Sequence, residues 1–321
     1  MSVNKRSLIR LENLDPYDFI IKWRMTEMCN IRCSYCLHSV HDDNRVIDTE
    51  LLHKQEERLC VVADKLNALI DRTRFKNVKI DFIGGEVTLF DLKKIISNFH
   101  TSKLKRINIT TNLMREKEYY IGLAEFCTGL GISLTLTASF HYEFQDIDVY
   151  FDKVSSIKDL VDIFACEMVS TADNQDLCRE FDERCKDIDV DYMIEADLRM
   201  ESENARREGL ITASRKPKKG MRYKAYFSDG SCEEYETRNK FLYDASIKEN
   251  CRQKMIETKG FFCTNTYDYF YLDFDMAAGR TESSDSCTNR IPIEEFKIIE
   301  PRMCPHSRCT LCGHQSIWRK I

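Results

Sequence analysis

Three cysteines near the start of the chain, Cys29, Cys33 and Cys36, form the pattern best suited to chemistry. They are spaced C-x3-C-x2-C and follow an apolar run, residues 19–21, that is typical of a buried strand. Because thiolate is the ligand that iron–sulfur clusters use, three thiolates on one tight loop can hold three irons of a [4Fe-4S] cube. The loop itself offers no fourth ligand, which leaves one iron open for a small molecule. A zinc knuckle, or chance clustering in a cysteine-rich chain, is the alternative.

A second candidate site is the tetrad Gly84-Gly85-Glu86-Val87, which follows a predicted strand over residues 78–83. Two glycines let the backbone leave the strand and approach a ligand with no Cβ in the way. Glu86 or the adjoining carbonyls can then accept hydrogen bonds from an ammonium group. A Gly-Gly pair alone is a common turn. Its position after a strand, about fifty residues beyond the cysteine loop, favours a binding role.

Two further polar segments, Thr111-Asn112 and Ser139-Phe140-His141, end the next two predicted strands. Asn and Ser favour strand-end caps and turns, so each segment is open to a structural reading as well as to ligand binding. We expect His141 to line a pocket or to be structural rather than to bind a metal.

With these motifs the chain resembles the radical S-adenosylmethionine (SAM) superfamily. The resemblance rests on the cysteine spacing, on Tyr35 directly before Cys36, and on the tetrad, which is similar to the Gly-Gly-Glu-Pro motif of that family. Val87 replaces the usual proline, and Leu113 stands where glycine often sits. The resemblance implies that Cys29, Cys33 and Cys36 hold a [4Fe-4S] cluster whose open iron is chelated by the amino and carboxylate groups of SAM. The cofactor-binding residues that it implies are Tyr35, Gly84, Gly85, Glu86, Thr111, Asn112 and Ser139.

Strands and helices alternate through the first two thirds of the chain. The predicted strands cover residues 18–25, 78–83, 106–110, 133–138, 162–168 and 190–196, and the predicted helices begin near residues 49, 89, 116, 150 and 174. Six β/α units imply a parallel sheet with right-handed crossovers. The predicted fold class is therefore α/β, a partial (β/α)6 TIM-like barrel with a small C-terminal Fe-S-binding appendage. Its lateral gap suits a large substrate, and its chemistry should lie at the carboxyl ends of the strands, where all four motifs fall.

The end of the chain carries a second set of cysteines. They are Cys263, Cys287, Cys304, Cys309 and Cys312. Before them, Asp229-Gly230 between two β-like runs predicts a hairpin, and a short helix is expected over residues 245–256. The tail resembles the SPASM or shorter twitch appendage of radical SAM enzymes, which implies one auxiliary [4Fe-4S] cluster. A zinc ribbon that uses some of these cysteines with His306 or His314 is the alternative.

These patterns predict four parts of the chain. They are an N-terminal extension over residues 1–17, a radical SAM core over 18–200, a linker with the hairpin and the short helix over 201–259, and a SPASM/twitch-like auxiliary-cluster domain over 260–321.

Composition limits the compartment and the partners. The 321 residues include 15 cysteines, and the chain begins without the apolar segment of a signal peptide. Many thiols without secretion point to a reducing cytosol, so we expect a cytoplasmic protein. No run of about 18 apolar residues occurs, so no membrane span is expected. The net charge of −5, from 48 basic and 53 acidic residues, predicts no nucleic-acid partner.

The resemblance implies reductive cleavage of SAM to a 5′-deoxyadenosyl radical, which abstracts hydrogen from an unactivated C–H bond. We expect oxidative modification of a peptide (a crosslink, a thioether, a dehydrogenation or an epimerisation), with a reductase or flavodoxin-type protein as electron donor. Cys166 and Cys232 are candidate hydrogen donors to a substrate radical. About seventeen residues precede the first strand, too few for a separate peptide-recognition domain, so the same chemistry on a sugar or another small metabolite is the alternative. A non-enzymatic zinc-binding interaction protein is the weaker alternative.

Overall fold

The structure is a computed structural model of the chain. It describes residues 8–14, 17, 19–36, 47–197, 210–215, 222–237, 262–263, 266–281, 284–300, 302–303 and 318–320. The predicted helix over residues 245–256 lies outside the described residues.

A ten-stranded sheet forms the centre of the fold. In spatial order its strands are β14 (Ser284–Pro292), β13 (Met276–Thr281), β12 (Tyr269–Asp273), β2 (Phe19–Thr26), β3 (Val78–Gly84), β4 (Leu104–Thr111), β5 (Ser133–Phe140), β6 (Ile163–Ser170), β7 (Asp191–Ala196) and β8 (Ala213–Arg215). Strands β2 to β7 run parallel in chain order, and β12 runs parallel to β2. Strands β8, β13 and β14 pair antiparallel at the two ends. The predicted α/β class is therefore confirmed.

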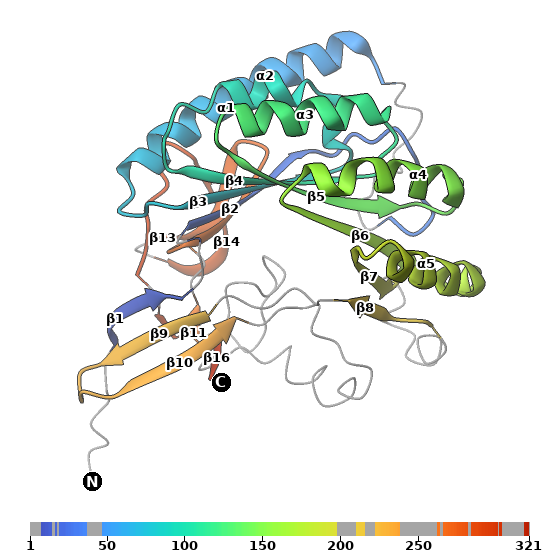
Figure 1. Ribbon diagram of the computed structural model, residues 1–321. Helices are drawn as coiled ribbons and strands as arrows, with labels where there is room; N and C mark the ends of the chain where they lie inside the picture. The colour runs from blue at the N-terminus through green and yellow to red at the C-terminus, as the bar shows by residue number, and fades with distance from the viewer. Residues whose placement is uncertain are drawn as a thin grey trace.

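The helices that alternate with these strands lie together over one face of the sheet (Figure 1). They are α1 (Thr49–Arg72), α2 (Leu92–Ser97), α3 (Lys117–Gly129), α4 (Ile147–Ile157) and α5 (Gln175–Asp187), with short 3-10 turns η1 (Val87–Leu89) and η2 (Lys158–Leu160). Asp48 caps α1, because its side chain accepts a hydrogen bond from the backbone N–H of Glu50. Among the described helices, none combines the length and the apolar character that a membrane crossing requires.

The side chains of β5 show how the two faces of the sheet differ. The Phe140 ring packs against Tyr150 of α4 and Phe181 of α5, with ring centroids 5.1 and 5.8 Å apart. Successive strand residues point to opposite faces, so Ser139 points to the face without helices. That helix-free face also carries a row of paired polar residues: Lys22, Asp81, Asn108 and Thr135.

Strand β12 extends the central sheet with a segment from the predicted appendage. The indole Nε1 of Trp23 donates to the carbonyl oxygen of Phe274 at 2.8 Å, and the Phe274 N–H donates to the Arg24 carbonyl oxygen at 2.9 Å. The guanidinium of Arg24 also lies 3.5 Å from the buried carboxylate of Asp273. The sheet therefore runs across the expected boundary at residue 260, and the predicted division of the chain into four parts stays a prediction.

Two small sheets complete the described fold. One contains β1 (Leu8–Asn13), β9 (Arg222–Phe227), β10 (Cys232–Thr237) and β16 (Trp318–Lys320), and the other pairs β11 (Phe262–Cys263) with β15 (Arg302–Met303). Strands β9 and β10 form the predicted hairpin, and Gly230 in its turn has a φ of +80°. Glycine suits this position because it adopts positive φ without a steric penalty.

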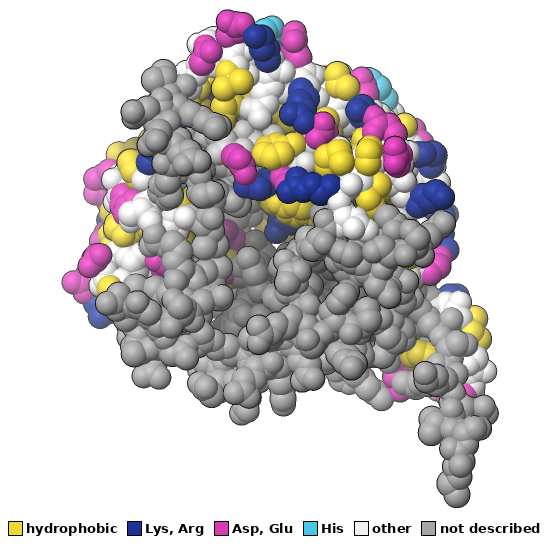
Figure 2. Space-filling model, turned by 180° about the vertical axis from the view of Figure 1, so that it is seen from behind, with side chains coloured by type: hydrophobic (Ala, Val, Ile, Leu, Met, Phe, Trp, Pro, Cys, Tyr) yellow, Lys and Arg dark blue, Asp and Glu magenta, His cyan; other side chains and the backbone are white. Residues whose placement is uncertain are grey.

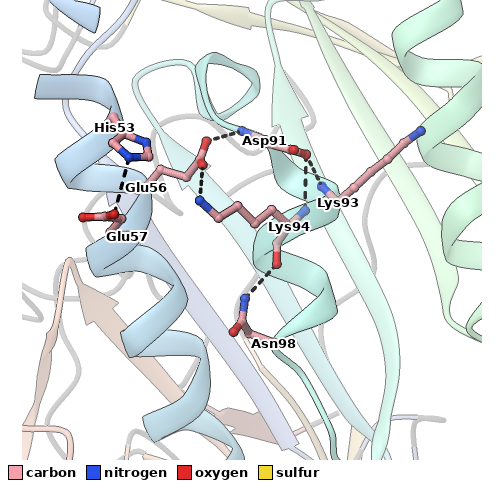
Figure 3. A network of polar contacts seen from close by, with 7 residues as sticks. All are labelled: His53, Glu56, Glu57, Asp91, Lys93, Lys94 and Asn98. Atoms are coloured by element: carbon pink, nitrogen blue, oxygen red, sulfur yellow. Dashed lines mark hydrogen bonds and ion pairs between the residues drawn. The ribbon is translucent and has the colours of Figure 1, made fainter. Parts of the chain in front are cut away.

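Polar contacts hold α1 to α2 on the outside of the helix layer (Figure 3). The carboxylate of Glu56 on α1 accepts from the backbone N–H of Asp91 at 2.9 Å and from the Nζ of Lys94 at 2.8 Å. Asp91 is the N-cap of α2, and its side chain accepts from the backbone N–H groups of Lys93 and Lys94. On the described part of the face in Figure 2, acidic and basic side chains are interspersed, as the balanced composition predicts.

The Asp91 cap gives a stability prediction. Replacing Asp91 with alanine leaves two N–H groups of α2 without their acceptor, so we expect the free energy of unfolding to fall by about 1 kcal/mol. Asp91→Asn is the matched control, because asparagine caps helices about as well as aspartate. Urea denaturation followed by circular dichroism measures both variants. Equal stability of the alanine and asparagine variants would show that the cap contributes nothing.

Candidate functional site

The predicted motifs meet at the carboxyl edge of the parallel strands. The cysteine loop follows β2, the glycine pair ends β3, Thr111 ends β4, and His141 follows β5. In parallel sheets this is the edge at which α/β proteins bind their ligands. The following contacts show that these segments touch one another.

The cysteine loop is compact and holds three unpaired thiols. Cys33 is buried, while Cys29 and Cys36 are half-buried. The Cys36 N–H donates to the Cys33 carbonyl oxygen at 3.1 Å, and a guanidinium N–H of Arg32 donates to the Cys29 carbonyl oxygen at 2.6 Å. Burial raises the pKa of Cys33 to about 12 and also raises the pKa of Cys29. Metal binding at this loop must therefore displace thiol protons.

The glycine pair packs directly on the backbone that leads into the cysteine loop. The Gly85 N–H donates to the Thr26 carbonyl oxygen at 2.8 Å, and the Glu86 N–H donates to the Met28 carbonyl oxygen at 2.7 Å. A Cβ on Gly84 would lie 2.2 Å from the Thr26 oxygen, and one on Gly85 would lie 2.0 Å from the Met28 oxygen. Gly84 also has a φ of +140°. The glycines are therefore required for contact with the protein's own chain, whereas the sequence suggested only the approach of a ligand.

Glu86 lies at the centre of a buried hydrogen-bond network. Its Oε1 accepts from the N–H and the hydroxyl of Thr88 and from the hydroxyl of Thr111, while its Oε2 accepts from the Asn112 N–H at 2.6 Å. Burial raises the pKa of Glu86, and these hydrogen bonds oppose the rise. The carboxylate thus joins the end of β3 to the end of β4. Its predicted contact with an ammonium group stays a prediction.

Asn112 connects β4 to the cysteine loop. Its Nδ2 donates to the Oδ1 of Asn30 at 2.7 Å and lies 4.0 Å from the Cys29 sulfur. The next residue, Leu113, has a φ of +55°, in the left-handed region that favours glycine. This conformation explains why the related motif often has glycine at the position of Leu113.

The segment after β5 contacts the cysteine loop at Cys33, Ser34 and Tyr35. The Nδ1 of His141 lies 3.2 Å from the Cys33 sulfur and 3.1 Å from the Tyr35 hydroxyl. The Tyr142 ring stacks on Tyr35 with centroids 5.3 Å apart. Glu143 accepts from both the N–H and the hydroxyl of Ser34.

Gln145 connects this segment to the residue after β4. Its Nε2 donates to the Asn112 carbonyl oxygen, and its Oε1 accepts from the backbone N–H of His141. The sequence predicts that His141 lines a pocket or is structural, but it does not identify Tyr142, Glu143 or Gln145. No spacing rule links them to the cysteines, because their proximity comes from the pairing of β4 with β5.

The two candidate hydrogen donors lie apart from this edge. Cys166 of β6 is fully buried and hydrogen-bonds Tyr150 and Cys185 on the helix side of the sheet. A thiol in that position cannot deliver hydrogen directly to a substrate beside the cysteine loop, so the structure argues against this role. Cys232 is exposed at the start of β10 in the small sheet. Ser139 is half-buried on the helix-free face and directly follows Ala138, which pairs with Thr111.

The tail cysteines are described only in part. Cys263 lies in β11 and Cys287 in β14, while Cys304, Cys309 and Cys312 lie outside the described residues, as do His306 and His314. Strand β11 pairs with β15 so that Phe262 is opposite Met303. Met303 directly precedes Cys304 in the sequence.

The donor set of the cysteine loop fits an iron–sulfur cluster. Within the described ranges, no group of three or more His, Cys, Asp and Glu side chains could hold a single metal ion. A [4Fe-4S] cube, however, takes one thiolate on each iron, so its cysteines do not have to converge on one point. Three free thiols on one loop, with none in a disulfide, meet that requirement.

Comparison with known proteins gives a similarity confined to part of the chain. No family model matches. A segment of 75 residues is 37% identical to the S-adenosylmethionine-dependent nucleotide dehydratase of Pseudoalteromonas ulvae. The aligned segment covers 22% of this chain and 24% of that protein. The chain thus matches about a quarter of the length of this relative. With the cysteine loop and its neighbouring motifs, this similarity to a SAM-dependent enzyme confirms the predicted resemblance to the radical SAM superfamily. The SPASM-like appendage stays a prediction.

Among solved structures, SuiB of Streptococcus suis bound to S-adenosylmethionine aligns with 14% identity and a TM-score of 0.41, over 56% of this chain and 41% of SuiB. SuiB bound to its precursor peptide SuiA aligns with 14% identity and a TM-score of 0.41, over 58% and 41% of the two chains.

The packing of the glycine pair predicts a specific loss of iron. A Cβ at position 85 would lie 2.0 Å from the Met28 carbonyl oxygen, so Gly85→Ala must displace the cysteine loop. We expect anaerobically reconstituted Gly85→Ala to hold markedly less iron at this loop and to lose about 1–3 kcal/mol of stability, the usual cost of overpacking. Gly129→Ala is the matched control, because a Cβ there meets no atom within 4 Å. Iron content equal to that of the control would contradict the packing argument.

Proposed function

We propose that this chain is a radical SAM enzyme whose first [4Fe-4S] cluster is held by Cys29, Cys33 and Cys36. The observation that carries the proposal is the meeting of three free thiols with Gly84–Glu86 and Thr111-Asn112 at one edge of a parallel sheet. When bound, such a cluster supplies the electron that splits SAM into methionine and a radical able to abstract hydrogen from an unactivated C–H bond.

The residues of the chain have distinct roles in this proposal. Gly84 and Gly85 fix the cysteine loop against β3, and Glu86 holds the end of β4 beside it. The SAM ammonium group is bound by the carbonyls of the glycine segment together with Oε2 of Glu86, which accepts a hydrogen bond from the Asn112 N–H and has a further lone pair. We propose that Asn112 and Ser139 position the rest of SAM, and that Thr111 contributes to binding through Glu86, to which its hydroxyl donates. Tyr35, stacked on Tyr142, shields the loop from water.

For the substrate, we propose a peptide that is modified oxidatively. In the described part of the chain the parallel strands form an open sheet bounded by β8 and β14 rather than a closed ring, and such an open sheet leaves room for a large substrate. A small polar metabolite is the second candidate. The row of Lys22, Asp81, Asn108 and Thr135 on the helix-free face favours it, as does the similarity to a nucleotide dehydratase. Mass spectrometry of labelled products from peptide and nucleotide libraries separates the two.

For the tail, we propose one auxiliary [4Fe-4S] cluster bound by Cys263, Cys304, Cys309 and Cys312, with Cys287 as the substitute ligand. The C-x4-C-x2-C run can bring three sulfurs to one cube, and the pairing of β11 with β15 supports Cys263 as the fourth ligand. Full cysteine ligation suits a cluster that passes electrons rather than binds SAM. The external electron donor that we propose is a reductase or a flavodoxin-type protein.

The cysteine loop gives the direct test of this function. Replacing Cys29, Cys33 and Cys36 together by alanine removes every proposed ligand of the first cluster. We expect 5′-deoxyadenosine formation under dithionite to be abolished while the iron of the tail cluster remains. Chromatography of the nucleoside products and iron analysis of the same sample measure the two quantities. Undiminished SAM cleavage in the triple variant would disprove the assignment.

The tail cluster gives a separate test. Removing Cys309 and Cys312 together should lower the iron content from about eight to about four per chain, since each cube holds four irons. Product formation should fall further than uncoupled SAM cleavage, because the first cluster stays intact. A wild-type protein that holds only about four irons together with one zinc would instead support a zinc ribbon.

A further inference from the structure

His141 is placed to act on the cluster through one of its ligands. Its Nδ1 lies 3.2 Å from the sulfur of Cys33, the most buried of the three loop cysteines. The same nitrogen lies 3.1 Å from the Tyr35 hydroxyl, so both contacts are made to one side of the ring. The sequence motifs assign no chemical role to this residue.

The imidazole is held in place from several directions. The backbone N–H of His141 donates to the Oε1 of Gln145 at 2.6 Å, and this bond fixes the backbone just after β5. The ring lies nearly parallel to that of Tyr35, at an angle of 13°. Glu143 holds Ser34, the residue between the two partners of His141. Rigid placement of this kind is typical of groups that orient or tune a metal ligand.

The chemistry of the contact changes when Cys33 binds iron. A free thiol can donate its proton to Nδ1, whereas a metal-bound thiolate can only accept. The contact then persists only if Nδ1 carries a hydrogen and donates it to sulfur. Hydrogen bonds to cluster sulfurs are one of the features that set reduction potentials, because they stabilise the more negative, reduced state.

We propose that His141 donates its Nδ1–H to the cluster-bound Cys33 sulfur and so raises the reduction potential of the SAM-binding cluster. The proposal rests on the proposed function, since it requires a cluster at this loop. His141 is a tuning residue that acts through Cys33 and not a fourth ligand, because the open iron is needed for SAM.

The test compares two substitutions at the same position. His141→Phe keeps an aromatic ring to stack on Tyr35 but has no N–H, whereas His141→Asn places an amide nitrogen close to the position of Nδ1. Both are made in full-length protein that lacks Cys309 and Cys312, so that a single cluster is titrated. Redox titration monitored by electron paramagnetic resonance, without SAM, gives the potential. Electron–nuclear double resonance of the reduced cluster detects the exchangeable proton near it. His100→Phe is the control, because it makes the same substitution at an exposed histidine that pairs with Asp64 and not with the cysteine loop.

We expect His141→Phe to raise the ratio of oxidised to reduced cluster at least tenfold at a given potential. For a one-electron couple this corresponds to a fall in the reduction potential of about 59 mV or more. The coupling of the Nδ1 proton should disappear in this variant, while the Tyr35 hydroxyl, which also hydrogen-bonds Cys33, keeps its own exchangeable proton. His141→Asn should retain the first coupling with a potential closer to that of the wild type. Unchanged potential and proton coupling in His141→Phe would overturn the proposal. Loss of iron from both variants would also overturn it, since His141 would then be a ligand or a purely structural residue. A wild-type protein that binds no iron would disprove the proposed function itself.

Discussion

The close contact between the end of β3 and the start of the cysteine loop is the constraint on which the site depends. Two backbone hydrogen bonds join Gly85 to Thr26 and Glu86 to Met28, and they form only because neither glycine has a Cβ. The loop that carries Cys29, Cys33 and Cys36 is thereby held against the parallel sheet. A loop that was free to move would lose conformational entropy on binding a cluster, whereas this loop is already ordered.

Polar side chains extend this constraint around the loop. Glu86 joins β3 to β4, Asn112 reaches from β4 to Asn30, and Gln145 joins Asn112 to the segment after β5. From there His141 contacts Cys33. The bonds of Glu86 and Gln145 connect the ends of neighbouring strands, while Asn112 and His141 reach the loop after β2, so the order of strands in the sheet determines which residues surround the cysteines. The hydrogen bonds to the buried Glu86 carboxylate offset part of the cost of its removal from water, and its pKa stays raised by burial.

Much of the fold could be predicted from the sequence, because the alternation of apolar strands and capped helices follows local rules. Asp48 before α1 and Asp229-Gly230 in the β9–β10 hairpin are examples. The cysteine loop could also be found from the sequence, since its three cysteines lie within eight residues. The pairing of β12 with β2 was not, because it joins positions about 250 residues apart and no local pattern encodes it. For the same reason, the helix-side position of Cys166 and the contacts of His141 and Glu143 required the structure.

The central claim is that the cysteine loop holds a cluster whose open iron binds SAM. Electron–nuclear double resonance on the reduced full-length protein, with SAM labelled with 15N at its amino group, tests this most directly. The account predicts a strong 15N coupling, as expected for a nitrogen bound to iron, that is absent when the three loop cysteines are alanine. A reduced cluster in the wild-type protein that shows no 15N coupling at saturating SAM would contradict it.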